Sequence, residues 1–88
     1  MMTYRAVFSD GHILTDSTKV AMCVARSFGS KPSFAWRGVM KRSNGTLFEA
    51  SGFCANELNA QQNLKRFRRD IKPREPSFTE IVPAEAVP

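Results

Sequence analysis

Two Asx-Gly pairs constrain the fold of this chain more than any other feature. Asp10-Gly11 and Asn44-Gly45 each lie between two segments in which apolar and polar residues alternate. Such alternation is typical of strands that bury one face, and an Asx-Gly pair supplies the positive φ angles that a tight turn needs. The sequence therefore predicts two β-hairpins, one near its start and one in its middle.

The first predicted hairpin joins the segments Tyr4–Phe8 and His12–Thr15. A two-residue loop at Asp10-Gly11 would fix its register, because loop length decides which residues face each other across the strands. This register pairs Phe8 with Ile13, Val7 with Leu14, and Arg5 with Asp16 as an ion pair.

The second predicted hairpin joins Phe34–Arg42 to Thr46–Phe53, with Gly45 in the left-handed conformation. Alternation divides its first strand into two faces, one aromatic and one partly basic. The aromatic face holds Phe34, Trp36 and Met40, with Gly38 between them, and the other face holds Ala35, Arg37, Val39 and Lys41. Glu49 is expected to pair with a basic residue on its own face.

A segment with helical periodicity follows each hairpin. The first helix is expected to start at an Asp16 or Ser17 cap and to end at Gly29. The second is expected over roughly Asn56–Ile71, where apolar residues recur at helical spacing. Its core-facing seam comprises Ala60, Leu64, Phe67 and Ile71.

The element order is therefore ββαββα, which indicates a single α+β domain. The most economical arrangement is an antiparallel four-stranded sheet with two helices packed on one face. We expect this domain to span residues 1–72. Residues 73–88 hold four prolines and a net charge of −2, which is typical of a flexible tail, although Ser77–Val82 alternates and could dock as an edge strand.

The positive charge belongs to the expected domain rather than to the tail. Residues 1–72 carry 12 Lys and Arg against 5 Asp and Glu, a net charge of +7, whereas the whole chain carries +5. A basic surface favours polyanionic partners, because neutralising phosphates releases counterions. The alternative is that the charge only keeps a small protein soluble.

The sequence shows no pattern typical of catalysis or metal binding. Cys23 and Cys54 stand 31 residues apart, and His12 is the single histidine, so the close ligand pairs of a zinc site are missing. There is no Gly-rich phosphate loop, and a nucleophilic dyad would have to use His12. We therefore expect a protein that is not an enzyme, with no cofactor and no metal. Since no signal peptide or membrane-spanning run is evident, we expect a cytoplasmic protein with reduced thiols and no membrane partner.

Basic residues concentrate on the second helix and on the strand that precedes the second turn. Such cations could clamp a phosphate backbone, although a solvated helix flank stabilised by the helix macrodipole is the alternative. The candidate nucleic-acid-binding residues are Arg37, Lys41, Arg42, Lys65, Arg66, Arg68, Arg69 and Lys72. Phe34 and Trp36 are expected in the core, but they would become a base-stacking platform if their face of the sheet were open.

Three segments together resemble small uncharacterised proteins of bacteriophages and prophages. They are Tyr4-Arg5-Ala6-Val7-Phe8-Ser9-Asp10-Gly11, Ala35-Trp36-Arg37 and Ala50-Ser51-Gly52-Phe53, and the resemblance covers residues 3–70. It implies an accessory protein of a mobile element that acts in the bacterial cytoplasm and binds a host protein, a defence complex or nucleic acid. It assigns no functional residue.

Two functions are favoured, and a small structural or oligomerising protein is a third, weaker alternative. The first is a small, basic, non-catalytic module that binds nucleic acid through a basic sheet or helix face. The second is a protein that inhibits or modulates a host protein or a defence complex, through a sheet edge, the basic face or the tail.

Overall fold

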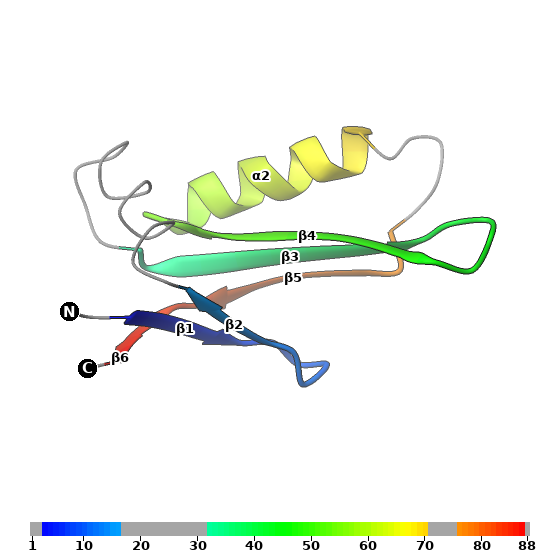
Figure 1. Ribbon diagram of the computed structural model, residues 1–88. Coiled ribbons are helices and arrows are strands. Elements are labelled where there is room, and N and C mark those ends of the chain that lie inside the picture. Colours follow the sequence, from blue (N-terminus) through cyan, green and yellow to red (C-terminus); the bar gives the residue numbers. More distant parts are fainter. Residues whose placement is uncertain (1–2, 17–31, 71–75, 88) are drawn as a thin grey trace.

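The computed structural model describes residues 3–16, 32–70 and 76–87. Within these residues the chain forms six strands and a helix in two antiparallel sheets, with strand orders β2-β1-β6 and β4-β3-β5 (Figure 1). The elements are β1 (Thr3–Val7), β2 (Ile13–Asp16), β3 (Phe34–Lys41), β4 (Leu47–Cys54), α2 (Glu57–Asp70), β5 (Phe78–Pro83) and β6 (Glu85–Val87).

The α+β class is confirmed, but the single four-stranded sheet is wrong. The two hairpins belong to different sheets, and each sheet gains its third strand from the C-terminal segment. β5 pairs with the edge of β3 that β4 leaves free, and β6 pairs in the same way with β1. Each hairpin therefore completes its sheet by pairing with a C-terminal strand and not with the other hairpin. The helix predicted to end at Gly29 lies outside the described residues.

The C-terminal segment is part of the fold over residues 78–87, which differs from the tail expected over residues 73–88 and agrees with the alternative that Ser77–Val82 docks as an edge strand. Phe78 faces Val39 across the strands, and Val82 faces Ala35. Both Phe78 and Val82 pack against the main core cluster, so the alternation in this segment reflects a half-buried strand. Proline is tolerated there because Pro83 is the last residue of its strand, at an edge of the sheet.

Each hairpin closes through a three-residue loop, and the two loops are of the same type. In the first, the Phe8 N–H donates to the His12 carbonyl at 2.9 Å and the Gly11 N–H donates to the Phe8 carbonyl at 3.0 Å. In the second, Arg42, Thr46 and Gly45 make the equivalent two bonds at 2.8 and 2.9 Å. Gly11 and Gly45 have φ angles of +89° and +88°, as expected for a type I turn that ends in a left-handed glycine.

The loop at Asp10 is one residue longer than predicted, and this shifts the register of the first hairpin. Val7 faces Ile13 and Arg5 faces Thr15, so the predicted pairing of Arg5 with Asp16 is wrong. Arg5 instead forms an ion pair with Glu85, its register partner on β6, at 3.3 Å. The loop at Gly45, predicted with a left-handed glycine, is confirmed.

The sheet β4-β3-β5 is the middle layer of the molecule. Figure 1 shows α2 on one side of it and the sheet of β1, β2 and β6 on the other. On the helix side, the ring of Phe67 lies against Gly38, where the missing side chain leaves room for it. On the opposite side, the core cluster of Ala6, Phe8, Ala35 and Phe53 fills the space between the two sheets. Both faces of β3 are therefore covered.

Candidate nucleic-acid interface

The sequence of α2 determines which of its side chains reach solvent. The helix begins where the Asn56 side-chain oxygen accepts the Asn59 N–H at 2.9 Å, an N-cap interaction that satisfies one of the unpaired amides of the first turn. Ala60, Leu64 and Phe67 are buried, as the seam predicted, and the fourth member, Ile71, lies outside the described residues. The other positions of the last two turns whose side chains are described are exposed.

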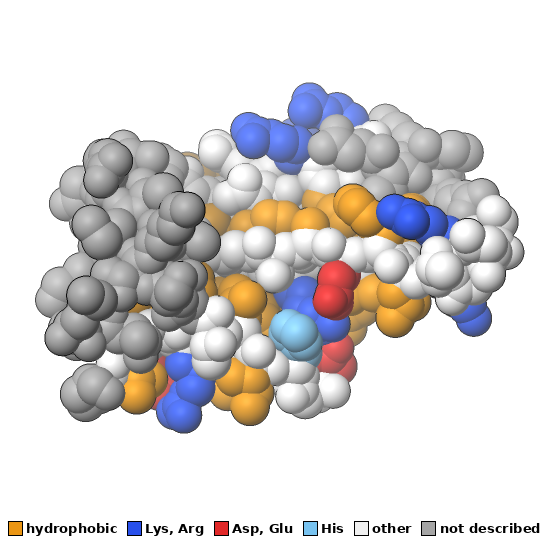
Figure 2. Space-filling view, in the orientation of Figure 1, with side chains coloured by type: hydrophobic (Ala, Val, Ile, Leu, Met, Phe, Trp, Pro, Cys, Tyr) orange, Lys and Arg blue, Asp and Glu red, His pale blue; other side chains and the backbone are white. Residues whose placement is uncertain are grey.

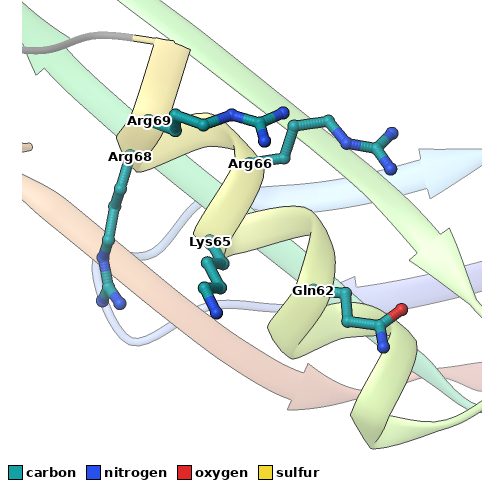
Figure 3. A pocket seen from close by; sticks show the side chains of 5 residues that line it. All are labelled: Gln62, Lys65, Arg66, Arg68 and Arg69. Atoms are coloured by element: carbon teal, nitrogen blue, oxygen red, sulfur yellow. The ribbon is translucent and has the colours of Figure 1, made fainter.

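Four of these outward positions are cationic, and they line an open depression of about 570 Å³ along the helix. We call this depression the basic groove; its described lining is Gln62, Lys65, Arg66, Arg68 and Arg69 (Figure 3). Figure 3 shows Arg66 and Arg69 extending side by side in one direction, whereas Arg68 points elsewhere. All five lining side chains are exposed. The sequence-predicted helix cations are therefore brought together, except Lys72, which lies outside the described residues.

Two cations of the basic groove have no carboxylate partner among the described residues. Lys65 and Arg66 form no ion pair with any described residue. Arg68 donates to the hydroxyl of Thr79 on β5 at 3.0 Å, a neutral partner that leaves the positive charge in place. Figure 2 shows blue side chains grouped over α2, while the acidic side chains visible in that view lie on the other side of the middle sheet. Lys65, Arg66 and Arg68 therefore carry positive charge that no described carboxylate pairs with, which favours an anionic partner.

Arg42 extends the basic surface toward the turn of the second hairpin. Its guanidinium carbon lies 5.3 Å from the centre of the exposed ring of Phe48 on β4. Phe48 stacks in turn on Phe67 of α2, with ring centres 6.0 Å apart and an interplanar angle of 5°. We call Arg42, Phe48 and Phe67 the aromatic column. Through it, Arg42 lies on the same side of the sheet as the basic groove.

Lys41 is exposed but belongs to a different face. Strand alternation places it on the side of Val39, opposite Met40. It therefore lies apart from the basic groove, and the structure does not join it to the helix cations.

Arg37, a candidate nucleic-acid contact from the sequence, is buried rather than exposed at the sheet surface. Arg37 is 7% exposed, because the sheet of β1, β2 and β6 covers its side of β3. Its guanidinium donates to the carboxylate of Asp10 in the first hairpin loop and to that of Glu49 on β4, the latter at 2.8 Å. It also lies over the ring of Phe78 at 5.4 Å, and its Nε has no hydrogen-bond partner among the described residues. Arg37 thus holds the two sheets together, and the expected pairing of Glu49 with a basic residue is confirmed.

This ion cluster shifts the pKa values of Asp10 and Arg37. Burial acts to raise the pKa of Asp10, but hydrogen bonds from the His12 N–H and from Arg37, together with the charge of Arg37, outweigh burial and lower it. Burial acts to lower the pKa of Arg37, but the hydrogen bonds to Asp10 and Glu49 outweigh burial and raise that pKa. Next to this pair, the Ser9 N–H donates to Glu80 at 2.7 Å. The first hairpin loop is therefore anchored to the middle sheet by two polar contacts.

Trp36, which the sequence left open between core and stacking platform, packs under α2. Its ring centre lies 6.4 Å from that of Phe67, and it is half-buried. The aromatic residue that reaches solvent beside the cations is Phe48, which sequence reasoning missed. Phe48 lies next to the second turn, six residues after Arg42. At this spacing across the end of a hairpin, Arg42 and Phe48 lie on the same face of the sheet, and this was the signal that could have identified Phe48.

The described residues contain no group of three or more His, Cys, Asp or Glu that could hold a metal ion. Cys54 is a buried thiol whose pKa burial raises, although a hydrogen bond from Asn63 at 3.1 Å partly opposes this. Within the same residue ranges, no helix has the length and apolar character needed to cross a membrane.

In comparisons with known proteins, no family model, curated protein or solved structure matches this chain.

Proposed function

We propose that this protein is a non-catalytic nucleic-acid-binding module whose basic groove on α2 holds a phosphate backbone. The observation that carries the proposal is the groove itself, in which four cations from two helical turns line one depression. Lys65 and Arg69 are separated along the helix axis by about 6 Å, at a rise of about 1.5 Å per residue. Cations at this spacing can contact successive phosphates of one strand.

The composition of the groove supports a polyanion over a single small anion. It is open rather than enclosed, and its Arg and Lys side chains are long and solvated. Contacts of this kind supply affinity and orientation without reading bases, so we expect binding with little sequence preference. We place this activity in the cytoplasm of a bacterial cell, as an accessory function of a mobile element.

The test is a titration of the protein with labelled single- and double-stranded DNA and RNA at two salt concentrations. If about four cations contact phosphates, affinity falls roughly 10²-fold between about 50 and 200 mM salt. Failure to bind any of these nucleic acids at about 50 mM salt would overturn the proposal. That outcome would leave the alternative of a host-protein partner as the function to test.

A matched pair of double variants separates the groove from net charge. Arg66→Gln with Arg69→Gln removes two charges from the groove, whereas Arg5→Gln with Lys41→Gln removes two charges elsewhere. We expect the first double variant to weaken binding and to lower the salt slope by roughly 2, and the second to change both little. Equal losses in the two double variants would show that overall charge, rather than the groove, drives binding.

A further inference from the structure

We propose that Phe48, with Arg42 beside it, is a stacking site for a nucleobase, which makes this surface selective for single-stranded nucleic acid. The inference rests on the proposed function and specifies its substrate class. Phe48 is 36% exposed and is the one aromatic residue among the exposed large hydrophobic side chains of the described residues. Exposed aromatic rings beside cations are the usual means by which proteins hold unpaired bases.

The ring of Phe48 is held in place by the buried ring of Phe67. It is stacked on Phe67, which is only 5% exposed, and Phe67 is itself packed between Trp36 and Gly38. A platform with a fixed orientation loses little conformational entropy when a base stacks on it. The aromatic column is therefore pre-organised for a planar ligand.

Arg42 supplies a second planar group at the same position. Its backbone is fixed by the hairpin loop, since its N–H donates to Thr46 and its carbonyl accepts from Gly45. Its guanidinium lies over the Phe48 ring, so a base either stacks on the guanidinium plane or replaces it on the ring, in which case Arg42 contacts the adjoining phosphate. Arg42 is exposed, so either arrangement leaves it accessible to a ligand.

The aromatic column and the basic groove share neighbouring residues of α2. Phe67, on which Phe48 stacks, lies between the groove residues Arg66 and Arg68. A nucleic-acid strand whose phosphates lie in the basic groove would therefore bring one of its bases near Phe48. In a duplex the base faces are covered by neighbouring base pairs, so only an unpaired strand can use both features.

The variant that tests this site is Phe48→Leu, which keeps an apolar contact with Phe67 but removes the aromatic face. The probes are a single-stranded oligonucleotide, the matching duplex, and an abasic strand of the same length that retains the phosphates. We expect Phe48→Leu to weaken binding of the single strand about 10-fold and to leave the duplex, the abasic strand and the salt slope unchanged. Phe48→Trp should retain the affinity of the unmodified protein for the single strand.

Each other outcome contradicts the stacking site in a distinct way. An unchanged affinity of Phe48→Leu for the single strand would show that the base does not contact this ring. Equal losses on all three probes would show that Phe48 acts only through packing, and a thermal unfolding curve of the variant would identify that loss. If the unmodified protein binds none of the three probes at low salt, the proposed function fails and the stacking site fails with it. If it binds the duplex but neither single strand, the stacking site alone fails. Binding of the abasic strand as tightly as the normal strand would overturn the stacking site alone.

Discussion

The ring of Phe67 lies directly against the backbone of Gly38. A β-carbon at residue 38 would come within 2.5 Å of two carbons of that ring, which is closer than real side chains approach. Phe67 cannot easily move away, because it is stacked on Phe48 and packed against Trp36. The position of α2 on the sheet, and therefore that of the basic groove, depends on this contact.

The first prediction follows from the contact. Gly38→Ala should destabilise the protein by about 1–3 kcal/mol, the usual cost of overpacking a core. Urea unfolding measures the effect. In a double-mutant cycle, Phe67→Leu should relieve part of the clash, so that the two substitutions together cost less than the sum of their separate effects. Strictly additive costs would show that the ring does not restrict residue 38.

The second prediction concerns the ion pair between Asp10 and Arg37. Asp10→Asn should lower the urea midpoint at neutral pH with an unchanged m-value, because Arg37 is buried and loses a charged partner. The turn itself should survive, since Asn44 occupies the equivalent loop position and accepts the Thr46 N–H as Asp10 accepts the His12 N–H. Asn44→Asp, in the exposed loop, is the matched control and should change the midpoint little. A midpoint unaffected by Asp10→Asn would remove the ion pair from the forces that join the sheets.

The third prediction is a pH dependence from the same carboxylate. The pKa of Asp10 is lower in the folded protein than its ordinary value of 3.8. Its stabilising contribution is therefore complete above that value and is lost as the pH falls through the folded-state pKa. Unfolding measured between about pH 2 and 7 should show the stability of the unmodified protein falling more steeply in acid than that of Asp10→Asn. Parallel curves over this range would contradict the shift.

The fourth prediction concerns the glycines of the hairpin loops. At Gly11 and Gly45 an added β-carbon meets nothing within 4 Å, so the cost of alanine there is conformational alone. Gly45→Ala should destabilise the protein by about 1–2 kcal/mol, and Gly45→Asn by less, because asparagine tolerates the left-handed region. Thermal unfolding compares the two variants. Equal stability of Gly45→Ala and the unmodified protein would mean that the loop can adopt another turn.

Several features of the fold follow from local sequence. Loops containing Gly11 and Gly45 were predicted because few other residues adopt positive φ. The buried side of α2 was predicted because Ala60, Leu64 and Phe67 recur at helical spacing. Both signals depend on residues close together in the chain, where backbone geometry leaves few alternatives.

Other features were decided by contacts between distant segments. Whether Arg37 is exposed depends on which segment covers its face of β3, and a sheet completed by β6, from the far end of the chain, covers it. The partition of the hairpins into two sheets depends in the same way on Phe78–Pro83 pairing with β3. Periodicity indicates that a strand has a buried face, but it does not identify the surface that buries it.

The candidate site likewise depends partly on local sequence and partly on contacts between distant segments. By itself, the sequence determined that Lys65, Arg66, Arg68 and Arg69 would project from a helix whose other side is buried, because a 3.6-residue repeat fixes both faces together. Only the tertiary structure removed Arg37 from this surface, separated Lys41 from it, and brought Phe48 and Arg42 beside it. Those placements depend on how the helix and sheets pack against one another, and no spacing along a single segment contains that information.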